Sequence, residues 1–305
     1  MTTSLKQPVN TPMHNAVLYG FGRVGKYIIR EFIQKNKFIN IYIIDDNYTV
    51  NDIVSGIAYD SIYGNIFKKD DLYISRNIIT IKNVKLFFNY RKYPEDSFII
   101  NATGGKINPL GNKPIYVTDS FDAKYGNNKR NIFTGSCDSI AIVPICQYLD
   151  SWFFIKNINV ITIHPAMNNQ SILDKSDIHL KNYQKLSIIN NVIIKETSLQ
   201  DILNKKFNKI PCLASSYRTP HDAVCSAIID VHLEDIYHSE VVMNVMNSYL
   251  NEKGYENIDC SRQSLHNTRG YNRGLLKYQN GFLRIPIFYD NEASVSKSLN
   301  EMFIS

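Results

Sequence analysis

The stretch Ala16–Gly25 reads Ala-Val-Leu-Tyr-Gly-Phe-Gly-Arg-Val-Gly. Its first four residues form a short apolar run, which is typical of a buried strand, and a G-x-G-x-x-G turn follows at once. Lys26–Ile33 then carries apolar residues at helical spacing, and Ile39–Ile44 reads as a second strand that ends at Asp45 and Asp46. This order of elements predicts an α/β domain with a doubly wound sheet: a strand, a glycine turn, a helix, a second strand and an acid.

The three glycines of this turn suit the binding of a dinucleotide. Gly20 permits a tight turn, Gly22 lets the backbone approach a pyrophosphate, and Gly25 allows the helix to lie close to the strand. The N–H groups at the helix start face the phosphates, and Asp46, 21 residues after Gly25, can accept both ribose hydroxyls. The residues expected to bind a cofactor are therefore Gly20, Gly22, Arg23, Val24, Gly25 and Asp46.

The acid after the second strand indicates NAD, because Asp46 and its neighbour Asp45 would repel the 2′-phosphate of NADP. A further strand, Ser97–Asn101, ends in a loop of small residues, where Thr103 and Gly104 are candidate cofactor contacts. A simple turn explains that loop equally well. For the G-x-G-x-x-G turn at Gly20–Gly25, the alternative is a glycine-rich turn of an α/β domain that binds no phosphate.

The composition is that of a folded protein without a membrane span. The chain has 305 residues, which favours two domains, and its 44% hydrophobic and 20% charged residues exclude wholesale disorder. No apolar run reaches about 18 residues, and the polar N-terminus does not resemble a secretory signal. We therefore expect no transmembrane helix and a cytoplasmic location.

The distribution of charges and the number of cysteines argue against nucleic-acid binding, a disulfide framework and a metal site. The net charge is +6, but the basic residues are scattered, so a solvated surface is favoured over a nucleic-acid-binding face. The five cysteines are odd in number and form no C-x-x-C pair. This pattern argues against a disulfide framework and against a zinc site, and it predicts no bound metal in a reducing compartment.

Cys137 differs from the other cysteines in its position. Asn131–Thr134 reads as a strand and Ser139–Leu149 as a buried helix, so Cys137 lies at a helix N-terminus, where the helix dipole stabilises a thiolate. His164 ends a β-rich run just before Pro165 and is the best available general base. We interpret as inert buried thiols Cys146, Cys212 and Cys225.

Taken in order, the motifs along the chain resemble those of the glyceraldehyde-3-phosphate dehydrogenase family. Ser136-Cys137 falls where the family has its serine-cysteine-threonine-threonine-asparagine motif, and His164 follows Cys137 by 27 residues, which is the family's spacing. Tyr289–Glu292 repeats a late tyrosine-aspartate-asparagine-glutamate motif. The other segments that resemble the family are Gly20–Gly25, Tyr59–Gly64, Ala102–Gly104 and Tyr217–Pro220.

This resemblance implies an α/β Rossmann dinucleotide-binding domain, residues 1–136 plus 291–305, and an α+β catalytic domain, residues 137–290. It also implies a cytoplasmic, glycolytic type of enzyme that assembles as a homotetramer or dimer. The implied reaction is the NAD-dependent oxidation of a phosphorylated aldehyde, such as glyceraldehyde 3-phosphate, through a thiohemiacetal and a thioester on cysteine.

The resemblance assigns roles to individual residues. By analogy Cys137 is the nucleophile and His164 is the base, while Asn291 orients the nicotinamide carboxamide. Ser136 and Arg218 contact the substrate, and Arg218 grips its phosphate.

Several positions depart from the family pattern. Asp138 stands where the family has a threonine that helps to bind inorganic phosphate, and Met167 and Asn191–Ile194 replace further phosphate contacts. A carboxylate at position 138 would repel phosphate and raise the pKa of the adjacent thiol. Two alternatives therefore stay open. One is a catalytically impaired homologue that acts as a binding or regulatory protein, and the other is a related semialdehyde dehydrogenase.

Overall fold

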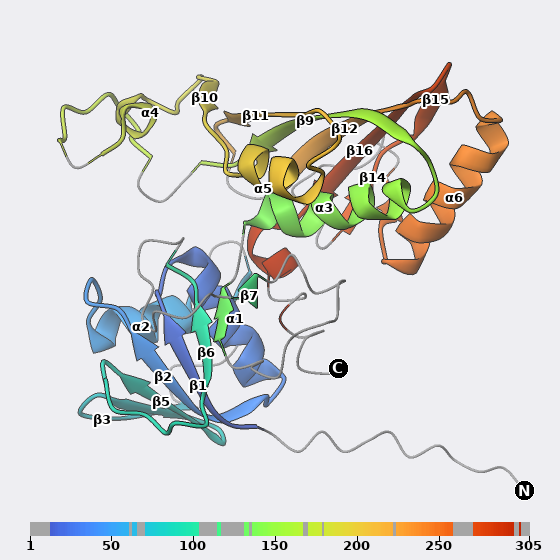
Figure 1. Ribbon diagram of the computed structural model, residues 1–305. Coiled ribbons are helices and arrows are strands. Elements are labelled where there is room, and N and C mark those ends of the chain that lie inside the picture. The colour runs from blue at the N-terminus through green and yellow to red at the C-terminus, as the bar shows by residue number, and fades with distance from the viewer. Residues whose placement is uncertain are drawn as a thin grey trace, which may run out of the picture. The chain divides into compact units, whose positions relative to one another are not determined.

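The chain divides into two compact units, Met1–Thr134 and Gly135–Ser305, in the computed structural model. Figure 1 shows their helices and strands coloured by residue number. The structure describes residues 13–60, 63–65, 71–103, 115–116, 131–133, 136–166, 170–178, 180–221, 224–258, 271–295 and 299. Among the helices in these ranges, none is long and apolar enough to cross a membrane.

The first unit is built on a mixed sheet with the strand order β3-β4-β5-β2-β1-β6-β8-β7. β1 (Met13–Tyr19) lies inside this sheet and pairs in parallel with β2 (Phe38–Ile44) and β6 (Phe98–Asn101). β5, β8 and β7 extend the parallel part, while β3 and β4 form an antiparallel edge beside β5. The outer strands are β3 (Leu72–Ser75), β4 (Ile78–Ile81), β5 (Val84–Phe88), β7 (Ile115–Tyr116) and β8 (Asn131–Phe133).

Two helices connect the strands around the glycine turn. α1 (Arg23–Gln34) begins directly after Gly22, and α2 (Val50–Ala58) follows β2. Arg30 of α1 is buried, and its Nη1 donates a 2.7 Å hydrogen bond to the carbonyl of Ile57 in α2. This bond satisfies a buried charge and holds the two helices together. The unit is compatible with the Rossmann-like fold expected from the sequence.

The second unit has its own sheet, with the strand order β10-β11-β9-β12-β16-β14-β13. Its long strands are β9 (Ile155–His164), β12 (Cys225–Leu233) and β16 (Phe282–Tyr289), and β12 runs antiparallel to both neighbours. β11 (Cys212–Arg218) pairs with β9 in parallel. The short strands are β10 (Ile193–Lys195), β13 (Glu256–Asn257), β14 (Tyr271–Arg273) and β15 (Lys277–Gln279), the last of which pairs with β16.

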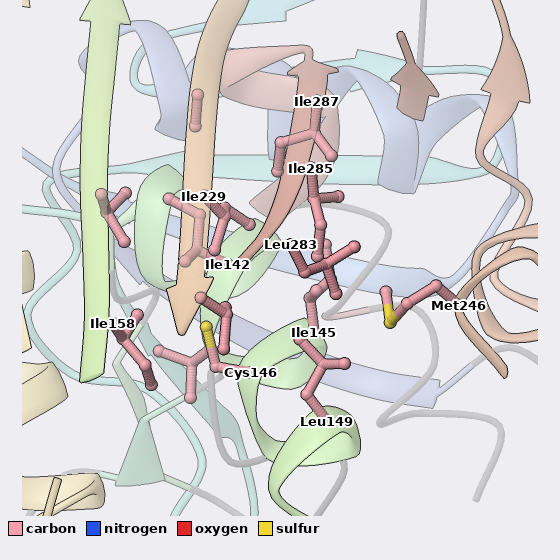
Figure 2. Packing of buried hydrophobic residues seen from close by; sticks show 14 of the residues in the cluster. Ile142, Ile145, Cys146, Leu149, Ile158, Ile229, Met246, Leu283, Ile285 and Ile287 are labelled. Carbon is pink, nitrogen blue, oxygen red and sulfur yellow. The ribbon is translucent and has the colours of Figure 1, made fainter. Parts of the chain in front are cut away.

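The helices of this unit are α3 (Cys137–Asp150), α4 (Asn182–Lys185), α5 (Leu199–Lys206) and α6 (Ser239–Glu252). Burial alternates residue by residue along β12, so one face of the sheet is buried in the core. α3, α5 and α6 contribute to that core. Figure 2 shows the packing of Ile142, Ile145, Cys146 and Leu149 of α3 with Ile158, Ile229, Leu283, Ile285 and Ile287 of the sheet and Met246 of α6.

Candidate active site

Four neighbouring strands of the second unit carry buried side chains at the same end of the sheet. Arg218 at the end of β11 lies opposite His164 at the end of β9. Cys225 at the start of β12 lies opposite Tyr289 at the end of β16. Each of the four is at most 7% exposed. The sheet therefore gathers a guanidinium, an imidazole, a thiol and a phenol in one place.

The start of α3 adds two more groups. Ser136 is the N-cap of this helix, and its hydroxyl accepts a hydrogen bond from the N–H of Ser139, whose hydroxyl accepts one from the N–H of Ser136. Cys137 and Asp138 are therefore the first two residues of the helix. The substrate contact expected of Ser136 stays a prediction, since the structure shows its hydroxyl in this cap.

Asp138 joins the helix to the sheet. Its Oδ2 lies 3.2 Å from Nε2 of His164, and its Oδ1 accepts a 2.7 Å hydrogen bond from the hydroxyl of Tyr289. Burial disfavours the charge of Asp138, but His164 and these hydrogen bonds hold the pKa of Asp138 below its usual value. Burial also disfavours the charge of His164, yet Asp138 raises the pKa of His164 to about 9. The two side chains therefore form a buried ion pair at neutral pH.

Cys137 lies beside this ion pair. Its Sγ donates to Oδ1 of Asp138 at 3.4 Å, and it lies with a ring nitrogen of His164 and Sγ of Cys225 in a group whose atoms are all within 4.8 Å of one another. The hydrogen bond with Cys225, burial and the charge of Asp138 together raise the pKa of Cys137 well above its usual value. These effects oppose the thiolate that the sequence predicts at the helix N-terminus.

Cys225 is buried, as expected, but it lies within the cluster. Its Sγ is 3.4 Å from Nδ1 of His164 and donates to Oδ1 of Asn291 at 3.8 Å. The amide of Asn291 in turn donates to Glu292 at 3.0 Å. Asn291, to which the family resemblance assigns a nicotinamide contact, is therefore a neighbour of the cluster. Buried and half-buried residues alternate along β12, and Cys225 lies on the buried side. This alternation is the sequence signal that could have placed Cys225 on the inner face of the sheet.

Two basic side chains lie near the cluster, Arg218 at the end of β11 and Lys195 of β10, which pairs with Ser216, two residues before Arg218. Arg218 donates through Nη1 to the carbonyl of Pro165, directly after β9. Lys195 ends β10, and burial and the charge of Arg218 lower the pKa of Lys195, while Asp138 and Cys137 act in the opposite direction. Lys195 is a second cation that sequence reasoning missed, because a single lysine on a short edge strand belongs to no motif.

In the glycine turn of the first unit, the backbone around Gly20 and Gly25 is tightly packed, whereas the space beside Gly22 is empty. Gly20 has a φ of +95°, and its N–H donates to the carbonyl of Ile44 at 3.1 Å. A Cβ on Gly25 would lie 2.1 Å from the carbonyl oxygen of Gly20, whereas a Cβ on Gly22 would meet no atom within 4 Å. Gly22 is also the N-cap of α1 and gives it no side-chain cap. These residues fit the diphosphate of a dinucleotide, which approaches bare backbone at such a position.

The two acids after β2 have different partners. Asp45 accepts a 2.7 Å hydrogen bond from the N–H of Phe21 and so holds the glycine turn. Asp46, the expected ribose ligand, is exposed and lies 2.8 Å from Arg91. A ribose contact by Asp46 stays a prediction, and it would have to replace or share the bond with Arg91.

The remaining residues suggested by the sequence lie in the first unit or outside the described ranges. Arg23 and Val24 are the first two residues of α1. Thr103 donates from its N–H and its hydroxyl to Oδ1 of Asn101, at 3.0 and 2.7 Å. Gly104 and Met167 lie outside the residues that the structure describes.

A hollow of about 430 Å³ lies elsewhere in the second unit, on β9, β12, β15 and β16. Asp230 and Arg284 in its lining form two 2.7 Å hydrogen bonds with each other. Asp230 alternates with the buried Ile229 and Val231, so it faces away from the core and from Cys137. Cys137 and the His164–Asp138 pair lie in the cluster and not in the lining of this hollow.

No family model matches the chain. The glyceraldehyde-3-phosphate dehydrogenase of Helicobacter pylori (strain J99 / ATCC 700824) is 24% identical to it over 182 residues, an alignment that covers 51% of this chain and 55% of that protein. The chain therefore spans about half the length of this relative. This similarity supports a glyceraldehyde-3-phosphate dehydrogenase-like family at most, and it suggests a dehydrogenase-like function.

Proposed function

We propose that this protein is an NAD-dependent aldehyde dehydrogenase with Cys137 as its nucleophile. The observation that carries the proposal is the cluster in which Cys137, half-buried at the start of α3, lies close to the buried His164 and Asp138. The open glycine turn of the first unit and the similarity to a glyceraldehyde-3-phosphate dehydrogenase also support it. The substrate is a phosphorylated aldehyde, because Arg218 and Lys195 offer two cations near the thiol.

Each residue of the cluster has a task in this reaction. Cys137 attacks the aldehyde carbonyl as a thiolate and forms a thiohemiacetal. His164, in the neutral form that gains population as the pH approaches its raised pKa of about 9, takes up the proton of the thiohemiacetal hydroxyl group as the hydride leaves. NAD, when bound at the glycine turn, supplies the hydride acceptor. Oxidation leaves an acyl group on Cys137 as a thioester, which a second nucleophile releases.

Asp138 controls the proton movements and the release of the acyl group. Its charge keeps His164 protonated up to a pKa of about 9 and raises the pKa of Cys137. The rate should therefore increase with pH through the neutral range. The same carboxylate repels inorganic phosphate, so water is the acyl acceptor that suits this site best.

The wider organisation is part of the proposal. The proposed NAD ligands come from the glycine turn, the acid after β2, the loop after β6 and the last motif of the chain. They are Gly20, Gly22, Arg23, Val24, Gly25, Asp46, Thr103, Gly104 and Asn291. Residues 1–136 and 291–305 form the NAD-binding domain and residues 137–290 the catalytic domain, although the division into compact units keeps 291–305 with the second unit. A homo-oligomer would cover apolar side chains on the outer sheet face, such as Ile161 and Leu213, which are 39% and 67% exposed.

The test is NAD reduction by the purified protein with glyceraldehyde 3-phosphate and with erythrose 4-phosphate, each with and without inorganic phosphate. We expect NADH to form with at least one aldehyde, at a rate that phosphate does not increase. A folded protein that reduces no NAD with either aldehyde would contradict the proposal.

A second candidate is a binding or regulatory protein that has kept this fold but lost its chemistry. The raised pKa of Cys137 favours it, because a neutral thiol is a poor nucleophile. The two candidates differ in the alkylation of Cys137 by iodoacetamide. If labelling at pH 8 stays incomplete while NAD still binds, the second candidate is supported.

A further inference from the structure

The cluster contains a set of potential metal ligands that the catalytic proposal does not use as such. Sγ of Cys137, a ring nitrogen of His164 and Sγ of Cys225 all lie within 4.8 Å of one another. They come from three separate elements, the start of α3, the end of β9 and the start of β12. No local cysteine spacing signals them, which is why the cysteine pattern of the sequence argued against zinc.

The spacing of these atoms is close to that around a tetrahedral metal ion. With metal–sulfur and metal–nitrogen bonds of roughly 2.3 and 2.0 Å, a sulfur and a nitrogen on zinc are about 3.5 Å apart. Sγ of Cys225 and Nδ1 of His164 are 3.4 Å apart. Sγ of Cys137 lies within 4.8 Å of Sγ of Cys225 and of a ring nitrogen of His164, so it can serve as the third ligand of such an ion.

The surroundings of His164 suit a metal ligand. When one ring nitrogen binds a metal, the other commonly donates to a carboxylate, which fixes the ring and its tautomer. Nε2 of His164 lies 3.2 Å from Asp138, whose other oxygen accepts the hydroxyl proton of Tyr289. This leaves Nδ1 as the nitrogen that faces Cys225. The carboxylate–histidine arrangement is therefore already in place on the correct side of the ring.

The chemistry of the ligands selects the ion. We infer that Cys137, His164 and Cys225 form a binding site for a thiophilic divalent cation of the zinc type, with a fourth position left open. Two thiolates and an imidazole favour Zn²⁺ over hard cations such as Mg²⁺ or Ca²⁺, which prefer oxygen. Each thiol forms a sulfur–metal bond and releases one proton, and Nδ1 of His164 gives up its proton as it binds, while Nε2 keeps its proton toward Asp138. Two thiolates then balance the charge of the ion.

Metal binding and thiol chemistry exclude each other at this site. A cation bound to Sγ of Cys137 occupies the electron pair that would attack a carbonyl or an alkylating reagent. The inference requires neither NAD nor an aldehyde. Its test can therefore fail while the proposed dehydrogenase activity is present, or succeed while that activity is absent.

The test is a titration of the reduced full-length protein with Cd²⁺, followed by the ultraviolet thiolate-to-cadmium absorption, with Zn²⁺ as competitor. We expect about one Cd²⁺ per chain, displaced by Zn²⁺. Cys137→Ser and Cys225→Ser should each weaken binding by at least about tenfold, and Asp138→Asn by roughly 10–100-fold. Cys212→Ser is the matched control, since Cys212 is also a buried thiol but donates to Ile210.

Two measurements on the unmodified protein keep the inference testable if a variant does not fold. Zn²⁺ should raise its thermal unfolding temperature and slow the alkylation of Cys137 by iodoacetamide at least about tenfold, both reversed by a chelator. The inference is overturned if the unmodified protein shows no cadmium absorption, or if Cys137→Ser and Cys225→Ser both bind Cd²⁺ as tightly as it does.

Discussion

The glycine turn of the first unit and the cysteine cluster of the second are built in opposite ways. In the turn, Gly20, Gly22 and Gly25 lie within six consecutive residues, and the chain itself fixes their spacing. In the cluster, Cys137 and Cys225 are 88 residues apart and meet only because α3 packs against the sheet. A sequence motif can therefore identify all the residues of a group that is contiguous in the chain, such as the glycine turn. It can identify only some residues of a group that the fold brings together, such as the cysteine cluster.

The largest effect should follow from removing the sulfur of the cluster. We expect Cys137→Ser to reduce NAD reduction by about 10³-fold or more, because a serine hydroxyl in this site is a far weaker nucleophile than a thiolate. Initial rates with the best aldehyde provide the measurement. Cys212→Ser is the control and should keep the rate within a factor of two to three. An equal loss of rate in both variants would contradict the assignment of Cys137 as the nucleophile.

The turn can be probed with two alanine substitutions. In Gly25→Ala the new Cβ would lie 2.1 Å from a backbone oxygen, so we expect a loss of about 3 kcal/mol in the free energy of unfolding. In Gly22→Ala the Cβ meets open space, and stability should change by less than about 1 kcal/mol. Denaturant titrations measure both, and NAD binding should weaken in Gly22→Ala although it stays folded. Equal stability of the two variants would contradict this account of the turn.

The ion pair in the cluster predicts how stability depends on pH. The pKa of His164 is raised from 6.5 to about 9, so the stabilisation is complete below about pH 6.5 and disappears as the pH rises through 9. The pKa of Asp138 is lowered, so the stabilisation also disappears as the pH falls through that lowered value. We expect the unmodified protein to exceed Asp138→Asn by on the order of 2 kcal/mol at pH 6 and by much less at pH 10. A difference that does not change between these pH values would be inconsistent with the pair.

The smallest effect concerns the reactivity of the thiol. Asp138→Asn removes a negative charge that raises the pKa of Cys137, so the thiolate fraction at pH 7 should increase. One unit of pKa corresponds to a tenfold change, and we expect iodoacetamide to label Cys137 about ten times faster in this variant. Peptide mass spectrometry measures the rate at this residue. Slower labelling would show that the Asp138–His164 pair activates the thiol.

Local elements were predictable because short-range patterns determine them. The helix expected at Lys26–Ile33 is part of α1, and the strand expected at Ile39–Ile44 is part of β2. The buried helix expected at Ser139–Leu149 begins two residues earlier, at Cys137, because the capping box of Ser136 and Ser139 sets its first turn.

The surroundings of Cys137 were only partly predictable. The sequence suggested His164 as its neighbour and indicated that Asp138 would raise the pKa of the thiol. It did not indicate Cys225 or Lys195, since their places depend on how β12 and β10 are arranged in the sheet. The hydrogen bond with Cys225, burial and Asp138 raise the pKa of Cys137 and so oppose the helix dipole that the sequence indicated.

The most direct test of the account is to trap the proposed acyl group on Cys137. The protein is mixed with NAD and glyceraldehyde 3-phosphate, quenched in acid and digested, and the peptides are analysed by mass spectrometry. The account predicts a 3-phosphoglyceroyl mass on the peptide that contains Cys137, which requires NAD and is absent from Cys137→Ser. An acyl group on another residue, or NADH formation without any acylated peptide, would contradict it.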